Sequence, residues 1–121
     1  MEKIKKTICV IQARTGSTRL PDKVLLKIKR KSILEIVIDR LKKSKKINQI
    51  ILATTRKVSD KRLIKIAKEK NIDYFTGSEE NVLKRFYSCS KKFNADIIVR
   101  ITSDCPLVDY RLVDEMITFY K

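Results

Sequence analysis

Four short apolar runs are each followed by a segment with apolar residues at helical spacing, and this alternation constrains the fold more than any other feature. The runs have the length and composition of buried strands and span residues 8–11, 49–54, 74–75 and 97–99. Strands joined through helices by short connections form right-handed crossovers, which give a mostly parallel sheet covered by helices on both faces. The sequence therefore predicts an α/β fold of the doubly wound type, built as one domain over residues 1–121.

Polar residues with helix-capping chemistry precede the helical patterns. They are Ser32, with Glu35 at capping-box spacing, then Ser59 or Asp60, and finally Asp109. The first helix is expected over about residues 32–44, and Asn71 is expected to end the second. The side chains expected to mark the inner faces of the last three helices are Leu63, Ile64, Ile66 and Ala67, then Val82, Leu83, Phe86, Tyr87 and Phe93, and then Leu112, Val113, Met116, Ile117 and Tyr120.

The composition is that of a folded, water-soluble chain. Hydrophobic residues make up 43% of the sequence, which is enough for a core. The sequence has no uninterrupted apolar stretch of membrane-spanning length, and residues 1–7 are a charged approach to a strand rather than a secretory signal. A cytoplasmic location without membrane insertion is expected.

The net charge of +15 favours anionic partners such as nucleotides, nucleic acid or acidic lipid. Most lysines lie in residues 27–31, 42–46 and 57–70, and few aromatic residues interleave with them. Stacking platforms for nucleic acid need such aromatic residues, so a solvated lysine-rich surface is the favoured interpretation.

The chain has no histidine, and its cysteines Cys9, Cys89 and Cys105 lie far apart. Their spacing fits neither a metal site nor a disulfide framework. Cys105 has no histidine partner and adjoins an aspartate, so it is a poor candidate nucleophile. Any catalysis is therefore expected to rest on carboxylates, cations and a hard metal ion.

Residues 12–23 form a polar loop after the first strand that is much too long for a simple turn. Cations at Arg14, Arg19 and Lys23 alternate there with small residues that offer backbone and hydroxyl donors, a mixture that suits a triphosphate. The loop matches neither the Walker A nor the GxGxxG pattern, and by itself it fits an ordinary surface connection equally well. A second polar loop, residues 102–109, leaves the sheet at the same carboxyl edge, so both are expected to meet in one crevice.

The sequence of residues 11–25, IQARTGSTRLPDKVL, closely resembles the signature of the cytidylyltransferase family that includes acylneuraminate and KDO cytidylyltransferases. The nearest branch is similar to the spore-coat polysaccharide biosynthesis protein F group. Further matches follow in family order at residues 37–41, 53–55, 77–83 and 100–109. The resemblance implies a Rossmann-like nucleotidyltransferase fold of the glycosyltransferase-A type, with this chain as the N-terminal half of the family domain.

The resemblance also implies a set of site residues. The expected catalytic residues are Lys23, Arg14 and Asp104, of which Asp104 would bind Mg²⁺. The expected nucleotide-binding residues are Gln12, Ala13, Arg14, Gly16, Ser17, Arg19, Lys23, Thr54, Thr55 and Ser78, with Ala53 and Glu80 as weaker candidates of the same kind. Without the upstream loop, Asp104 would fit an Asx turn or a helix cap equally well.

The function implied by the resemblance is the transfer of CMP from CTP to an acidic or related sugar, with release of pyrophosphate. Relatives are roughly twice as long, and their later half is expected to hold the sugar pocket, the dimer contacts and a second acidic metal ligand. A nucleotide-binding module without turnover is therefore the alternative. A third hypothesis, that the charge of +15 serves nucleic acid, is disfavoured by the scarcity of aromatic residues.

Overall fold

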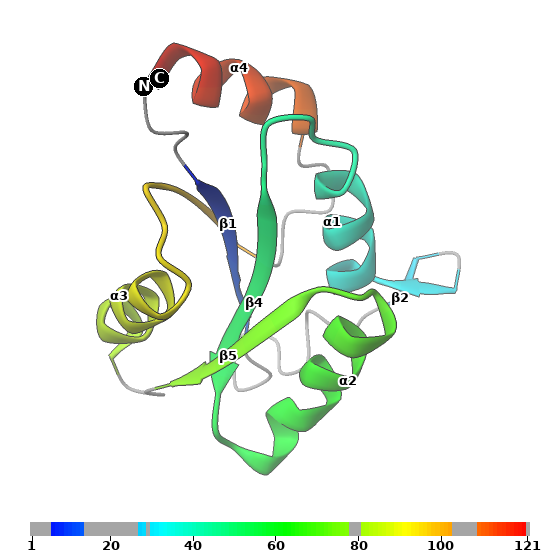
Figure 1. Ribbon diagram of the computed structural model, residues 1–121. Coiled ribbons are helices and arrows are strands. Elements are labelled where there is room, and N and C mark those ends of the chain that lie inside the picture. Colours follow the sequence, from blue (N-terminus) through cyan, green and yellow to red (C-terminus); the bar gives the residue numbers. More distant parts are fainter. Residues whose placement is uncertain (1–5, 14–26, 29, 78–80, 103–108, 121) are drawn as a thin grey trace.

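A computed structural model of the chain describes residues 6–13, 27–28, 30–77, 81–102 and 109–120. Its main sheet has four parallel strands in the spatial order β5-β4-β1-β6 (Figure 1). The strands are β1 (Thr7–Gln12), β4 (Gln49–Thr55), β5 (Asp73–Gly77) and β6 (Ile97–Thr102). The predicted parallel sheet is confirmed, and each strand begins within two residues of its expected start.

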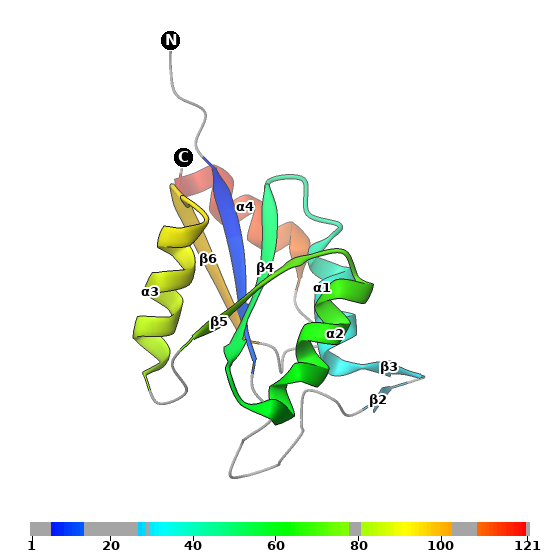
Figure 2. The same ribbon diagram turned by 60° about the horizontal axis from the view of Figure 1, so that its bottom comes forward.

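Helices cover both faces of this sheet (Figure 2). The helices α1 (Ile33–Leu41), α2 (Lys61–Glu69) and α4 (Tyr110–Tyr120) lie on one face, and α3 (Val82–Lys92) lies on the other. Side chains alternate across a strand, so Cys9 and Ile11 pack toward α1 while Ile8 and Val10 pack toward α3. The doubly wound fold is therefore confirmed.

The helix ends follow the predicted chemistry with one difference in length. The Ser32 hydroxyl accepts the N–H of Glu35 at 3.1 Å, and the Asp109 carboxylate accepts the N–H of Arg111 at 2.9 Å. Asn71 ends α2 in the left-handed conformation at φ 57°, which asparagine tolerates better than most residues. The helix α1 ends at Leu41, before the predicted residue 44, because a turn follows in which the N–H of residue 44 donates to the carbonyl of residue 41.

The predicted inner faces of the last two helices are partly wrong. Phe86 packs against the core, and Val113 and Ile117 are buried, but four residues expected beside them are exposed. Those four are Leu83, Tyr87, Leu112 and Met116. Each helix presents only a narrow stripe to the sheet, so apolar residues outside that stripe stay in contact with solvent. The side chains of Val82 and Tyr120 lie outside the described part of the structure.

A two-stranded antiparallel hairpin, which sequence patterns did not indicate, precedes α1. It consists of β2 (Lys27–Ile28) and β3 (Lys31–Ser32), with Lys27 paired to Ser32. Arg30 in its loop has φ 76°, a left-handed conformation that is uncommon for residues other than glycine. Strands of two residues are too short to produce a periodic pattern, which explains why the hairpin was missed.

The carboxylate of Asp114 attaches α4 to the loop between α1 and β4. It accepts the backbone N–H groups of Lys45 at 3.0 Å and Lys46 at 3.2 Å, and it also accepts the Ser44 hydroxyl. Burial by itself would raise the pKa of Asp114, but these hydrogen bonds hold it below its ordinary value. The position of α4 is therefore fixed by a polar clamp as well as by its two buried side chains.

We predict that Asp114→Asn lowers the free energy of unfolding by about 0.5–1.5 kcal/mol at pH 7, because the amide cannot accept all of these hydrogen bonds. The folded-state pKa is lowered, so the carboxylate stabilises the fold above its ordinary pKa of about 4, and this contribution is lost as the pH falls through the folded-state value. Urea unfolding at pH 7 and near pH 2.5 measures the difference. A difference in the free energy of unfolding between wild type and Asp114→Asn that does not change with pH would contradict the clamp. Glu115→Gln, on the same helix, is the control.

Candidate functional site

The carboxyl ends of all four parallel strands lie along one edge of the sheet. Gln12 at the end of β1 is in register with Ala53 of β4 on one side and with Thr102 of β6 on the other. Doubly wound sheets bind ligands beyond this edge. The two polar loops singled out from the sequence follow β1 and β6, so both leave the sheet here.

A buried arginine lies on the α3 side of this edge. Arg85 of α3 is only 2% exposed, and its Nη2 donates to the Oε1 of Gln12 at 2.9 Å. A guanidinium carries donors only, so this bond fixes which way the Gln12 amide is turned, with its oxygen toward Arg85. The Nε2 of Gln12 then faces away from Arg85, is buried, and has no hydrogen-bond partner among the described residues.

Gly77 provides the space through which Arg85 reaches Gln12. A Cβ atom at Gly77 would lie 2.9 Å from the Cγ of Arg85, which is closer than real Cβ contacts come, and 3.0 Å from the Cε1 of Phe75, which is a tight contact. Gly77 ends β5 and is in register with Thr55 of β4. Close packing against Arg85 therefore favours glycine at this position. The arginine side chain extends along the α3 face of the sheet, from Gly77 of β5 to Gln12 of β1.

Two threonines that end β4 have different roles. The Thr55 hydroxyl donates to the carboxylate of Asp60 and accepts the N–H of Lys57 at 3.2 Å, which closes the turn into η2 (Val58–Asp60). Asp60 stands at the N-cap position of α2 as expected, but its side chain makes no capping bond there. The Thr54 hydroxyl is buried and has no partner among the described residues. Thr54 therefore offers a free polar group at this edge.

Of the remaining predicted site residues, Ala13 is buried in the core, and its N–H donates to the carbonyl of Ala53 at 3.0 Å. The others lie outside the described residues. They are Arg14, Gly16, Ser17, Arg19, Lys23, Ser78, Glu80 and Asp104. Gln12, Ala13 and Thr54 therefore all lie at the strand ends, but the Gln12 side chain is on the α3 face of the sheet and the side chains of Ala13 and Thr54 are on the α1 face. The roles assigned to all of these residues stay predictions.

The cysteines that the structure describes are core residues, as expected. Cys9 and Cys89 are both fully buried, and burial raises their pKa values to about 12 and about 11. Such thiols stay protonated at neutral pH and are poor nucleophiles. Cys105 lies outside the described residues, within which no group of three histidine, cysteine, aspartate or glutamate side chains is placed to hold a metal ion.

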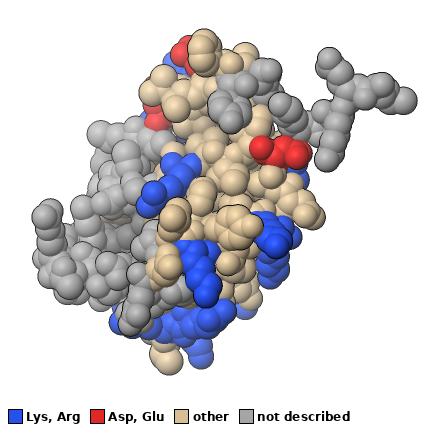
Figure 3. Space-filling model, turned by 90° about the vertical axis from the view of Figure 1, so that its left-hand side faces the viewer, with Lys and Arg blue, Asp and Glu red and all other residues tan. Residues whose placement is uncertain are grey.

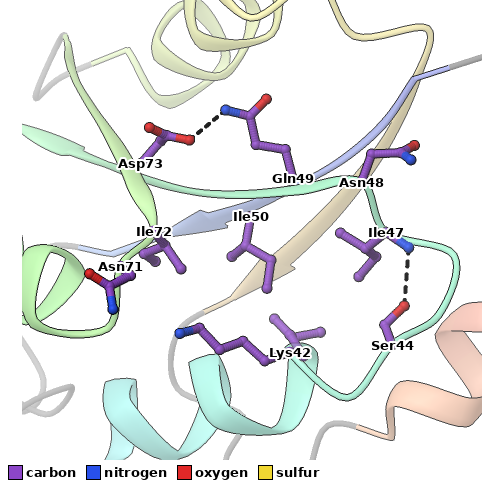
Figure 4. Close-up of a pocket in the computed structure, with 10 residues that line it drawn as sticks. Lys42, Ser44, Ile47, Asn48, Gln49, Ile50, Asn71, Ile72 and Asp73 are labelled. Atoms are coloured by element: carbon purple, nitrogen blue, oxygen red, sulfur yellow. Dashed lines mark hydrogen bonds between the residues drawn. The ribbon is translucent and has the colours of Figure 1, made fainter.

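A separate cavity of about 290 Å³ lies at the opposite edge, by the amino ends of β4 and β5 (Figure 4). Gln49 donates to the Asp73 carboxylate there at 2.5 Å, and Lys42 donates to the carbonyl of Lys70. Gln49 and Asp73 of this cavity are therefore engaged with each other, and the cavity is distinct from the carboxyl edge.

Basic side chains are spread over the molecule rather than confined to the candidate site. Figure 3 views the side of α3, where lysine and arginine form separate groups among uncharged residues. Lys84, Lys91 and Lys92 of α3 are all exposed. This distribution fits a solvated basic surface that attracts anionic ligands in general.

Comparison with known proteins supplies the family. A model of the cytidylyltransferase family matches residues 8–121. The chain belongs to this family. It is 38% identical over 112 residues to the spore coat polysaccharide biosynthesis protein SpsF of Bacillus subtilis, a match that covers 89% of the chain and 47% of that protein.

Two solved structures share the fold. A cytidylyltransferase from Leptospira borgpetersenii has a TM-score of 0.92 and 39% identity, over 96% of this chain and 49% of its own. A CMP:2-keto-3-deoxy-manno-octonic acid synthetase in complex with CTP has a TM-score of 0.84 and 26% identity, over 94% of this chain and 46% of its own. The chain therefore spans about half the length of the relatives it matches. No helix in the described ranges is long and apolar enough to cross a membrane.

Sequence reasoning missed Arg85 and the link between Thr55 and Asp60. A signal for Arg85 was available, because it lies four residues before Cys89 and therefore on the same face of α3. A charged residue on the inner face of a helix needs a partner, and the end of the neighbouring first strand is where that partner lies. The Asp60 carboxylate resembled an ordinary helix cap, so sequence alone gave no reason to join it to Thr55.

We predict that Gly77→Ala lowers the free energy of unfolding by about 1–3 kcal/mol, because the new methyl group overlaps Arg85. In an Arg85→Ala background the same substitution should cost clearly less, since the main obstacle has been removed. Urea unfolding of the wild type, both single variants and the double variant measures this coupling. Strictly additive effects would show that Gly77 and Arg85 do not depend on each other.

Proposed function

We propose that this chain forms the CTP-binding half of an enzyme that transfers CMP from CTP to an acidic or related sugar, with release of pyrophosphate. Family membership over residues 8–121 supports the nucleotidyl transfer. The sugar class rests on relatives whose names refer to spore coat polysaccharide and to 2-keto-3-deoxy-manno-octonic acid. Both of those proteins are about twice as long as this chain.

The buried Gln12 amide at the end of β1 is the observation that carries the proposal. Its Nε2 lacks a partner among the described residues. A buried polar group without a partner costs about 1–3 kcal/mol, so such groups at a ligand-binding edge are expected to meet a ligand. The N3 and O2 atoms of cytosine accept hydrogen bonds, whereas N3 of uracil donates one. An amide donor held in this orientation therefore favours cytosine over uracil.

The triphosphate is assigned to the part of the polar loop, residues 12–23, that begins at Arg14. Arg14, Arg19 and Lys23 would supply the positive charge, with Ser17 and the backbone at Gly16 as additional donors. Arg85 adds a permanent charge on the α3 side of the same edge. Catalysis then consists mainly of holding the phosphates in line and balancing their charge.

In the proposed reaction a sugar hydroxyl oxygen attacks the α-phosphorus of CTP. The new bond joins that oxygen to phosphorus, the bond from the α-phosphorus to the bridging oxygen breaks, pyrophosphate leaves, and the hydroxyl proton passes to solvent. Asp104 stands two residues after Thr102 in the sequence, and Thr102 ends β6 in register with Gln12. The carboxylate proposed to hold Mg²⁺ therefore follows the strand that neighbours β1. One carboxylate together with phosphate oxygens suits Mg²⁺, which when bound would neutralise charge on those oxygens.

We predict that CTP raises the melting temperature of the chain more than UTP, ATP or GTP, each tested with and without Mg²⁺, because a ligand of the folded state stabilises it by mass action. Gln12→Glu keeps an acceptor for Arg85 but removes the Nε2 donor. It should therefore lower the preference for CTP over UTP by about five- to tenfold, the equivalent of one hydrogen bond.

Asn48→Asp is the matched control for that experiment. It makes the same change in charge at the opposite edge of the sheet and keeps the acceptor for the N–H of Thr7, which the Asn48 side chain binds at 2.7 Å. This variant should retain the CTP preference. The absence of any CTP shift in the wild type would disprove CTP binding, and an unchanged preference in Gln12→Glu would remove Gln12 from base recognition.

Turnover distinguishes the enzyme from a nucleotide-binding module without turnover, which the half-length match favours as the second candidate. Pyrophosphate release from CTP, Mg²⁺ and a panel of acidic sugars is the measurement. For an active chain, Lys23→Ala and Asp104→Ala should each lower the rate by about 10²–10³-fold. A CTP shift without pyrophosphate release would establish the module instead.

A further inference from the structure

The cavity at the amino ends of β4 and β5 has an apolar wall (Figure 4). Its volume of about 290 Å³ is near the lower end of the range for small-molecule sites. Ile47, Ile50 and Ile72 form the wall, and all three are only half-buried at the border of the core on the α1 side. An apolar group that entered the cavity would therefore remove further isoleucine surface from water, which is favourable.

Lys42 places an ammonium group at one end of this cavity. It is the C-cap residue of α1, and its Nζ donates to the carbonyl of Lys70, the C-cap residue of α2. Lys70 is itself held by an ion pair of 2.9 Å with Asp39 of α1. An ammonium group has three donors, so two remain for another acceptor. The charge of Lys42 is therefore held beside the end of α2, with donors to spare.

Asn71 presents an amide at the same end. Its backbone is fixed in the left-handed conformation at φ 57°, and its N–H donates to the carbonyl of Lys68 at 3.1 Å. The Asn71 side chain lines the cavity and makes no hydrogen bond within the described part of the structure. Figure 4 shows the Lys42 side chain extending toward Asn71. The two residues therefore offer unused donors to one acceptor group.

The charges around the cavity favour an anion over a cation. Of the described residues that line it, Asp73 alone is acidic, and its carboxylate already accepts the Gln49 amide. The carbonyl groups at the ends of α1 and α2 carry partial negative charge, which the Lys42 ammonium offsets. Three more lysines are exposed in the turn after α1, namely Lys43, Lys45 and Lys46.

We propose that this cavity, the amino-edge site, binds a small organic anion that carries a carboxylate or phosphate group on a compact apolar body. The anionic group accepts hydrogen bonds from Lys42 and Asn71, and the apolar body covers the isoleucine wall. Inorganic phosphate reaches only the donors, and a neutral apolar molecule reaches only the wall. The site lies at the opposite edge of the sheet from the proposed CTP site, so the inference does not depend on the proposed function.

Phenyl phosphate and benzoate are the probes, because they carry the two anionic groups on the same ring. Each is titrated into the full chain labelled with ¹⁵N, and the amide signals are followed by NMR. Both probes should shift the amides of Ile50, Asn71 and Ile72, with a dissociation constant of about 1–10 mM for molecules of this size. The tighter probe identifies the anionic group. Inorganic phosphate and benzyl alcohol, which each lack one feature, should bind about tenfold more weakly or less.

Lys42→Met and Asn71→Gly remove the two donors separately. Methionine keeps the unbranched apolar stem of the lysine, and glycine adopts the left-handed conformation of Asn71 without strain. Each variant should weaken phenyl phosphate binding by about fivefold or more, through the loss of a hydrogen bond to a charged group. Lys43→Met makes the same change at the neighbouring exposed lysine, which does not line the cavity, and should leave binding unchanged.

The fold of each variant is checked by its unfolding midpoint in urea. Lys42→Met also removes the bond to the Lys70 carbonyl, so a loss of stability is expected there. Asn71→Gly breaks no side-chain hydrogen bond among the described residues and keeps the test decisive.

Competition with CTP separates the amino-edge site from the carboxyl edge. Excess CTP with Mg²⁺ should leave the shifts at Ile50 and Ile72 in place, whether or not the chain binds CTP. Displacement of phenyl phosphate by CTP would overturn the inference, as would the absence of binding by both probes. Inorganic phosphate that binds as tightly as phenyl phosphate would reduce the site to a general attraction of lysines for anions. Unchanged binding in both Lys42→Met and Asn71→Gly would also contradict the site.

Discussion

The rest of the structure depends on β1, which is buried at every position. Two strands pair with it, and its alternate side chains enter the two separate cores, so a shift in its register would misplace both. A strand enclosed on all sides can meet solvent only at its ends. Gln12 and Ala13, which are still buried, therefore mark the end of the core at the carboxyl edge, and the basic loop follows them in the sequence. The location of the site follows from how completely β1 is buried.

Three features of its surroundings compensate for the burial of the charged Arg85 side chain. The Gln12 oxygen accepts a hydrogen bond from the guanidinium, Gly77 leaves room for the side chain, and the charge lies near an edge suited to anions. A guanidinium does not lose its proton under ordinary conditions, so this edge keeps a positive charge at any pH the fold survives. The same contact orients Gln12. Arg85 therefore both supplies positive charge at this edge and sets the orientation of the buried Gln12 amide.

The sequence was sufficient for the strands, the helices and the doubly wound arrangement, because each depends on local periodicity and capping that Ser32, Asn71 and Asp109 express directly. It was insufficient wherever a residue's role depends on another segment. Arg85 meets Gln12 across 73 positions of sequence, and no local pattern predicts that contact. Met116 and Leu112 looked like core residues because an apolar residue on a helix shows only that it avoids water, and not which surface will cover it. The phosphate and metal residues of the candidate site rest on family resemblance, since they lie beyond the described strand ends.

Charged residues accompany both edges of the main sheet. At the β5 edge Asp73 is exposed and the Nζ of Lys68 lies 5.6 Å from the ring of Tyr74, so charges protect that strand against further pairing. At the β6 edge Asp96, just before the strand, and Arg100, within it, are exposed. Ile98 lies between them and is 37% exposed. Exposed charges on an edge strand oppose unwanted pairing, so the exposed apolar side chain of Ile98 is flanked by charges that have this effect.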